Sequence, residues 1–199
     1  LHAFDYSLLK GQQIIIRRAR KGETMATLDG VVRNFIPDDL LIADAEDAVA
    51  IAGVMGGYAS EVTGNTKKVL LESAWFDPVS VRRTSRRLAL RTESAIRFER
   101  GVDPNGVLKA VYRVAWLMKE LKCGEPSRQI AIARAGEEAP ILIELTEDKI
   151  AKVLGTDIPT GQTEQILEGL GFTLDGMASK WQVGVPSFRR DIFIAEDVI

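Results

Sequence analysis

The stretch from 77 to 104 constrains the fold more than any other, because it holds several helix-boundary signals in succession. Asp77-Pro78 predicts a helix start, since Asp caps free backbone N–H groups and Pro is pre-set for the first helical position. Thr92 predicts the cap of a second, short helix, and Gly101 fits the position just after its end. Two helices are therefore expected to meet at Thr92.

Arginines crowd both sides of this junction: Arg82, Arg83, Arg86, Arg87 and Arg91 precede Thr92, and Arg97 and Arg100 follow it. Few acidic residues accompany them, although the net charge of the whole chain is −2. One interpretation is an ordinary solvated charged face. The local imbalance of charge favours the other, a positive patch that binds an anionic partner. Any contact with a nucleic acid would have to come from such a patch, because the chain as a whole is not basic.

Two further features attract attention upstream. Glycines at 53, 56 and 57 follow an apolar run, but their spacing is not that of a dinucleotide-binding loop. They indicate either a tight turn, which is the favoured interpretation, or a close approach of backbone to a ligand. Glu72 ends a strand that looks buried, where an unpaired carboxylate would be costly. It should therefore pair with a following arginine or bind a polar group of a ligand.

The order of strand and helix signals predicts an α+β fold. Short apolar, β-branched runs dominate the first part, and a long amphipathic helix follows the arginine-rich stretch. We expect strands over 13–17, 40–44, 48–54 and 68–74, a hairpin at Asp29-Gly30, a helix over 105–122 and an edge strand over 128–134.

A change of composition at 135–140 predicts a linker, after which the signals run in the order strand, helix, helix, strand, strand in a smaller module. We therefore predict a β-rich, sandwich-like domain with flanking helices over 1–136 and a small helix-containing α+β module over 140–199. The sequence opens without an initiator Met and closes within a helical pattern, so we expect an internal fragment, truncated at its C-terminal side.

Composition excludes several classes of protein. No run approaches the ~20 apolar residues that a membrane-spanning helix needs. The single cysteine, Cys123, excludes an intramolecular disulfide and a multi-cysteine zinc site. A reducing, cytoplasmic setting is expected.

Several long strings identify a family. They are LHAFD (1–5), IAGVMGG (51–57), LLESAWFDP (70–78), RRTSRRLALRTES (82–94), RFERGVDPNG (97–106) and VPSFRRDI (185–192). They occur in the same order in β subunits of bacterial phenylalanyl-tRNA synthetase, and the resemblance covers essentially the whole chain. The first part resembles the central editing module of that subunit, and the part from Pro140 on resembles the small module after it.

The resemblance implies that this chain carries the site that hydrolyses tyrosine wrongly attached to the tRNA for phenylalanine. The whole enzyme is a class II aminoacyl-tRNA synthetase, a phenylalanine–tRNA ligase that uses ATP and Mg²⁺. ATP binds to the separate α subunit, and the expected assembly is an (αβ)₂ heterotetramer in the cytoplasm. The alternative for the isolated chain is a non-catalytic module that binds tRNA and supports the subunits.

Carried over residue by residue, the family's editing pocket falls on His2, Gly56, Glu72, Thr92 and Ser94. Glu72 is expected to hold the phenol hydroxyl of tyrosine, with the ammonium as an alternative, and Gly56 to leave room for the ring. His2 and Thr92 are expected to position the ester and the attacking water, without His2 acting as a full general base. Ser94 departs from the family, which usually has Ala there, so the polarity of the pocket is open.

The arginines of the patch, above all Arg86, Arg87 and Arg91, are expected to hold the tRNA backbone through salt-sensitive contacts. The resemblance also implies a magnesium site at Asp191 and Asp197, with oxygen ligands that suit this ion. The further carboxylates of that site would lie beyond Ile199, so we expect the site to be incomplete here. Without the resemblance, the two aspartates are typical of a helix N-terminus.

Overall fold

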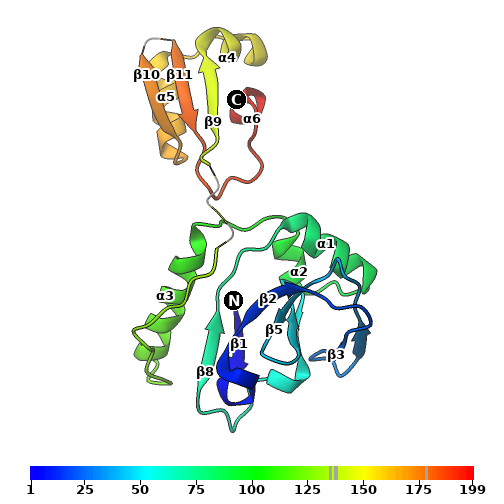
Figure 1. Cartoon of the computed structure of the whole chain (residues 1–199). Coiled ribbons are helices and arrows are strands. Elements are labelled where there is room, and N and C mark those ends of the chain that lie inside the picture. The colour runs from blue at the N-terminus through cyan, green and yellow to red at the C-terminus, as the bar shows by residue number, and fades with distance from the viewer. Residues whose placement is uncertain (135, 137–138, 178) are drawn as a thin grey trace. The chain divides into compact units, whose positions relative to one another are not determined.

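The computed structural model describes residues 1–134, 136, 139–177 and 179–199, which form two compact units, Leu1–Pro126 and Ser127–Ile199 (Figure 1). Each unit mixes strands and helices, which confirms the predicted α+β class. The predicted domain bounds, 1–136 and 140–199, stay a prediction, because three residues of the expected linker lie outside the described residues.

The first unit is built on small antiparallel sheets. Its strands are β1 (His2–Asp5), β2 (Ile15–Arg18), β3 (Thr24–Ala26), β4 (Val32–Asn34), β5 (Leu40–Ala43), β6 (Ala48–Ile51), β7 (Met55–Gly56) and β8 (Val69–Glu72). Single-turn 3₁₀ helices lie at η1 (Tyr6–Leu8), η2 (Lys10–Gln12) and η3 (Tyr58–Ser60). The largest sheet has the order β2-β5-β6-β7, while β1 pairs with β8 and β3 with β4.

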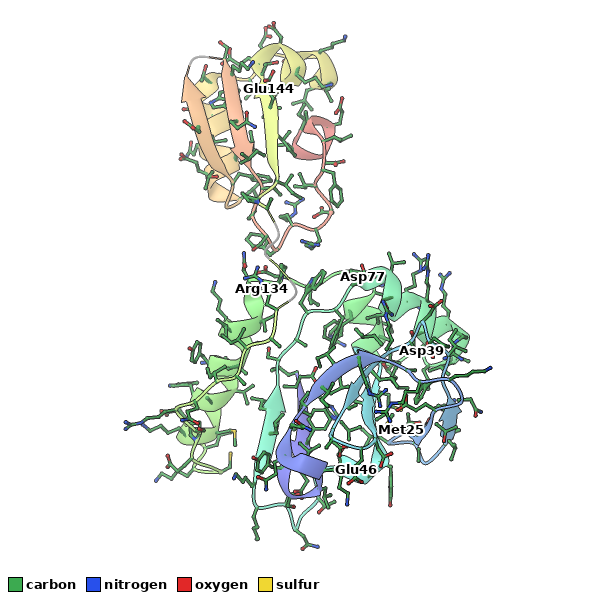
Figure 2. The ribbon with its side chains drawn as sticks, in the orientation of Figure 1. Met25, Asp39, Glu46, Asp77, Arg134 and Glu144 are labelled. Carbon is green, nitrogen blue, oxygen red and sulfur yellow. The ribbon has the colours of Figure 1, made fainter. Side chains whose placement is uncertain are left out.

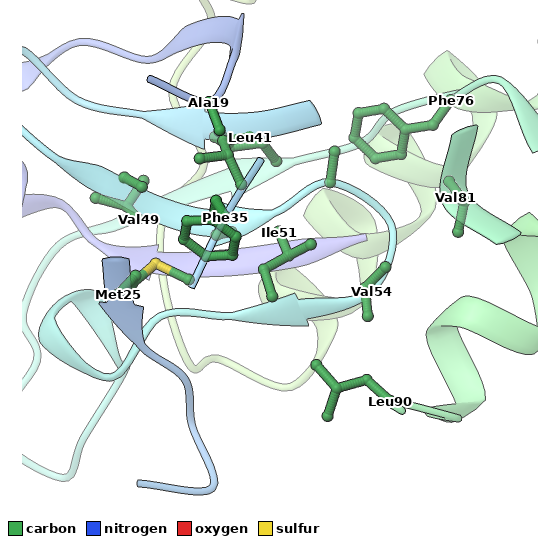
Figure 3. Packing of buried hydrophobic residues seen from close by; sticks show 14 of the residues in the cluster. Ala19, Met25, Phe35, Leu41, Val49, Ile51, Val54, Phe76, Val81 and Leu90 are labelled. Carbon is green, nitrogen blue, oxygen red and sulfur yellow. The ribbon is translucent and has the colours of Figure 1, made fainter. Parts of the chain in front are cut away.

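The apolar runs without polar alternation form the centre of this unit. All four residues of β6 are buried, as are three of the four in β5. Such runs cannot present a wet face, so both faces of the sheet are covered. Figure 3 shows Leu41 and Ile51 of these strands packed with Val81 and Leu90 in one cluster.

Three helices follow β8: α1 (Pro78–Arg87), α2 (Glu93–Phe98) and α3 (Gly106–Glu120). Asp77 caps α1 by accepting a hydrogen bond from the Ser80 backbone N–H at 2.7 Å. Thr92 caps α2 by accepting from the Ala95 N–H at 3.0 Å. Both predicted caps are confirmed, and Val81 on α1 is buried against the core.

Two expectations in the following segment are wrong in detail. Residues 128–134 form no strand among the described residues, and their side chains are exposed, so an alternating pattern was present without a partner strand to pair with. The long helix exists, but it spans Gly106–Glu120 rather than 105–122, and Lys122 takes the left-handed conformation after it, with φ 52°.

The second unit is a three-stranded antiparallel sheet of order β10-β11-β9 with its own helices. Its elements are β9 (Leu142–Thr146), α4 (Glu147–Leu154), α5 (Thr160–Gly169), β10 (Thr173–Met177), β11 (Lys180–Gly184) and α6 (Ala195–Val198). Thr146 caps α4 at the Lys149 N–H, and Trp181 and Leu145 are almost fully buried in the core. No described helix is both long and apolar enough to cross a membrane.

Candidate active site

The pairing of β1 with β8 places a histidine opposite a carboxylate. His2 and Glu72 are direct partners in this antiparallel register. Directly opposed side chains in an antiparallel pair lie on the same face, so the two side chains project to one side of this ribbon. The His2 ring also packs edge-on against Phe4, with 4.5 Å between ring centroids.

The turn between β6 and β7 approaches the same place. Gly53 in this turn has φ +69°, a left-handed conformation that glycine adopts without strain, which confirms the predicted tight turn. Gly56, at the end of β7, lies against the His2 ring. A Cβ atom at position 56 would be 2.5 Å from Cε1 of His2. The backbone therefore approaches the imidazole as closely as the absence of a side chain permits.

The N-terminus of α2 closes the third side. The hydroxyl of Thr92 donates to the Val54 carbonyl oxygen at 2.7 Å while it accepts the capping bond from Ala95. Ser94 donates from its hydroxyl to the Gly53 carbonyl oxygen at 3.0 Å. The helix end and the turn of β6 and β7 are thus joined by two side-chain hydrogen bonds.

A cavity of about 280 Å³ lies between these elements. His2, Gly56, Glu72, Thr92 and Ser94 all line it, so the structure brings together the five residues on which the resemblance placed an editing pocket.

Most other walls of the cavity are apolar. They include Phe76 and Phe98, whose ring centroids are 5.2 Å apart, together with Leu28 and Val54. These wall residues were not among the predicted site residues. Phe76 and Phe98 lie in two of the family strings, but no local pattern indicated that their side chains meet across the fold.

The electrostatics of the cavity are set mainly by burial. Burial raises the pKa of Glu72 from its usual value to about 7. Oε2 of Glu72 is buried, and no group among the described residues donates a hydrogen bond to it. Burial also lowers the pKa of His2. Burial therefore favours the uncharged form of both side chains.

The sequence left two alternatives for Glu72, an ion pair with a following arginine or a bond to a polar group of a ligand, and the structure agrees only with the second. Within the described residues it forms no ion pair with an arginine. A buried, unpaired oxygen in a cavity is costly unless a ligand completes its hydrogen bonding.

Comparisons with known proteins now decide the family. Residues 1–123 match the model of the B3/4 domain, and residues 143–199 match that of the tRNA synthetase B5 domain. The chain belongs to the B3/4 domain family. It carries B5 sequence after the B3/4 region.

Two similar curated proteins are β subunits of phenylalanine–tRNA ligase. The chain is 47% identical over 192 residues to a phenylalanine–tRNA ligase β subunit of Moorella thermoacetica, covering 96% of this chain and 24% of that protein. It is 46% identical over 202 residues to the same subunit of Anaeromyxobacter dehalogenans, covering all of this chain and 25% of that protein. The identity over nearly the whole chain confirms the resemblance noted in the sequence. The chain spans about a quarter of the length of these relatives.

A solved structure of an N-terminal fragment of the phenylalanyl-tRNA synthetase β subunit from Pyrococcus horikoshii has a TM-score of 0.49 and 16% identity. It covers 99% of this chain and 56% of that one.

The predicted arginines of the B3/4 region lie outside the cavity lining. Arg86 and Arg91 are exposed. Arg87 differs, because its guanidinium is paired with Asp39, whose side chain is only 2% exposed, and it also donates to the Asn34 carbonyl oxygen. Figure 2 shows Asp39 beside α1. All three arginines are thus exposed at the surface, and Arg87 differs in that its guanidinium is held by a buried carboxylate.

In the B5 region, the two aspartates predicted to bind metal already have partners. Asp191 forms two hydrogen bonds with Arg189, at 3.0 and 2.9 Å. Oδ2 of Asp197 accepts from the backbone N–H groups of Phe193 and Ile194. Among the described residues, no three side chains of His, Cys, Asp or Glu gather as possible ligands. As arranged here, these aspartates do not fit a magnesium ion.

Proposed function

We propose that the B3/4 unit hydrolyses the ester of tyrosine wrongly attached to the tRNA for phenylalanine. The observation that carries this proposal is the buried, unpartnered Oε2 of Glu72 in a cavity with mostly apolar walls. Such a cavity accepts an aromatic side chain and offers it one polar group deep inside the protein.

The need for such a site follows from magnitudes. An apolar pocket rejects an added hydroxyl only by about 10²-fold. A site whose buried polar group must be paired has the opposite preference, because a ligand without the hydroxyl leaves that group unsatisfied. Tyrosine completes the hydrogen bonding of Glu72, whereas phenylalanine does not.

The raised pKa favours the phenol hydroxyl over the ammonium group as the partner of Glu72. An ammonium group pairs best with a charged carboxylate, whereas burial here disfavours the charged form. A phenol forms a hydrogen bond with either form of the carboxyl group. Glu72 therefore selects the side chain, and the ester lies nearer to Thr92 and His2.

Hydrolysis requires a water oxygen to attack the ester carbonyl, the bond to the ribose oxygen to break, and a proton to reach that oxygen. His2 is uncharged near neutral pH and can hold the water by accepting a hydrogen bond. In the described part of the chain no carboxylate is hydrogen-bonded to its ring, so we assign it positioning rather than full general-base work. The free hydroxyl of the terminal adenosine is the proposed proton carrier.

The exposed arginines supply the grip on tRNA in this proposal. Arg82, Arg83, Arg86 and Arg91 are exposed around α1 and the start of α2. Phosphate contacts by such side chains give affinity that falls as salt rises. Arg87 contributes to this surface only indirectly, since it holds α1 to Asp39.

We further infer, from the names of the relatives, that this chain functions within a phenylalanine–tRNA ligase. That class II enzyme would pair the β subunit with an α subunit as an (αβ)₂ assembly in the cytoplasm. ATP and Mg²⁺ would act in aminoacylation on the α subunit, and no step of the hydrolysis proposed here involves them.

The test is deacylation of tyrosyl-tRNA for phenylalanine by the αβ enzyme and by this chain alone, with phenylalanyl-tRNA as the control substrate. We expect selective loss of the tyrosyl ester with the αβ enzyme and a large loss of that activity in Glu72→Ala. A Glu72→Ala enzyme that deacylates normally would contradict the proposal.

A second function is supported by the row of exposed arginines, namely binding of tRNA by a non-catalytic scaffold. The same variant separates the two functions. In a scaffold, Glu72→Ala leaves both tRNA affinity and deacylation unchanged. In the editing site it lowers deacylation while affinity stays nearly constant.

A further inference from the structure

The contacts of Ser94 point to a role that differs from binding substrate. Its side chain lies at the start of α2 and lines the cavity. Its hydroxyl proton is nevertheless directed to the Gly53 carbonyl oxygen at 3.0 Å. A hydroxyl has one proton to donate, so Ser94 cannot donate to a ligand without giving up this bond.

Thr92 makes the equivalent bond to the next carbonyl along the chain. Its hydroxyl donates to Val54 at 2.7 Å, so two successive carbonyl oxygens of the turn are held by two hydroxyls from one helix end. Gly53 is further confined by Val81, Phe76 and Phe98, each within 3.2 Å of the place where its Cβ would be. Figure 3 shows Val54, Phe76 and Val81 in the same cluster. The turn therefore has little freedom to move toward α1.

The position of this turn sets the width of the cavity. The turn leads directly into β7, where Gly56 lies against the His2 ring. A shift of the turn away from α2 would carry Gly56 with it and change the space between β7 and His2. Because cavity walls with catalytic groups need to be held within about 0.5 Å, a small shift there is enough to affect reaction.

We propose that Ser94 is a positioning residue, which together with Thr92 fastens the turn of β6 and β7 to α2 and so fixes the distance of Gly56 from His2. This inference rests on the proposed editing function for its kinetic consequence, but not for its structural one. In this role the additional hydroxyl stiffens the wall and leaves the polarity that the substrate meets to Glu72.

The experiment compares Ser94→Ala and Ser94→Thr with the unchanged protein, all in the αβ enzyme. Amide hydrogen exchange is measured at Val54 and Gly57, whose N–H groups bond to Ile51 and Val49 within this hairpin. Ser94→Ala should speed exchange there by about fivefold, the factor for one neutral hydrogen bond. Ser94→Thr keeps the hydroxyl and should restore the slow rate. Ser127→Ala, the same change at an exposed site in the second unit, serves as the control.

The kinetic readout is the split between kcat and KM for deacylation of tyrosyl-tRNA. Ser94→Ala should lower kcat by about fivefold and leave KM unchanged, because the grip on tRNA lies elsewhere. A fall in kcat without faster exchange at Val54 and Gly57 would show direct contact with substrate and overturn the inference. So would a Thr variant that behaves like the Ala variant. If the unchanged enzyme does not deacylate the tyrosyl ester, the proposed function fails, and hydrogen exchange alone then decides whether Ser94 holds the turn.

Discussion

Asp39 and Glu72 lie in different regions of the first unit, and each has a buried carboxylate oxygen, but the hydrogen bonding of the two side chains is opposite. Asp39, at the junction of the sheet with α1, accepts hydrogen bonds from the Ile36 N–H, the Thr84 hydroxyl and the Arg87 guanidinium. Glu72, at the cavity, has a buried oxygen without a donor among the described residues. Burial alone therefore does not distinguish a structural carboxylate from a functional one. The number of satisfied hydrogen bonds does, because protein groups satisfy Asp39 while Glu72 is left for a ligand.

The largest expected effect is at Asp39. Asp39→Ala removes three hydrogen bonds to a charged acceptor and leaves Thr84 without its partner, so the free energy of unfolding should fall by about 4 kcal/mol. Denaturant unfolding followed by circular dichroism measures this. Asp38→Ala, at the exposed neighbouring position, should change the free energy by less than about 0.5 kcal/mol. Equal effects of the two substitutions would remove the distinction drawn between the regions.

Removing the Glu72 carboxylate should raise the free energy of unfolding, whereas removing that of Asp39 lowers it, and the size of the gain should depend on pH. Burial raises its pKa to about 7 in the folded state from the usual value of 4.5, so the unfolded chain releases this proton first as pH rises. The contribution of Glu72 to stability therefore falls between pH 4.5 and about 7, by roughly 3 kcal/mol at most, and stays low above that range.

Glu72→Gln tests this sign, because it removes the titrating group with little change of shape. The variant should be more stable than the unchanged chain at pH 8, and the difference should shrink towards pH 4.5. Denaturant unfolding of both proteins across this range gives the comparison. A Gln variant that is less stable at pH 8 would mean that the carboxylate is satisfied in the folded state, as Asp39 is.

The sequence predicted the surroundings of Glu72 better than those of Asp39. The caps at Asp77 and Thr92 and the turn at Gly53 were predictable, because each depends on residues within a few positions of one another. The contacts of Asp39 with Thr84 and Arg87 were not, since they join residues 45 and 48 positions apart and leave no periodic signal. Without that contact, Arg87 was indistinguishable from the exposed arginines beside it.

The pocket was predicted from the family resemblance rather than from local sequence patterns. Local pattern showed only that Glu72 ended an apolar strand and that glycines formed a turn. The family strings placed His2, Glu72 and Thr92 in one site, which the cavity then contained. The edge strand expected over 128–134 shows the limit of pattern alone, since alternation of apolar and polar residues does not supply a neighbouring strand.

An intermediate loss of stability is expected for Gly56→Ala, at the wall of the cavity beside His2. Gly56→Ala places a methyl group 2.5 Å from the imidazole, so the ring or β7 must move, at a cost of about 1–2 kcal/mol. Deacylation should fall more than stability, because the same methyl group enters the cavity. Gly64→Ala is the matched control, since a Cβ there meets no atom within 4 Å. Thermal unfolding and single-turnover deacylation of both variants check the prediction, and equal rates for the two would contradict it.

The smallest effects should separate two arginines that are adjacent in sequence. Arg87→Gln replaces the charged donor to Asp39 with a neutral one, so the free energy of unfolding should fall by about 1 kcal/mol. Arg86→Gln alters an exposed side chain and should change stability by less than about 0.5 kcal/mol. In tRNA binding the order reverses: Arg86→Gln should weaken affinity and reduce its dependence on salt, while Arg87→Gln should leave the salt slope nearly unchanged. Filter binding at several salt concentrations, together with unfolding curves, measures both. An equal reduction of the salt slope by Arg87→Gln and Arg86→Gln would contradict this prediction. It would mean that the bond to Asp39 does not keep Arg87 from contacting tRNA.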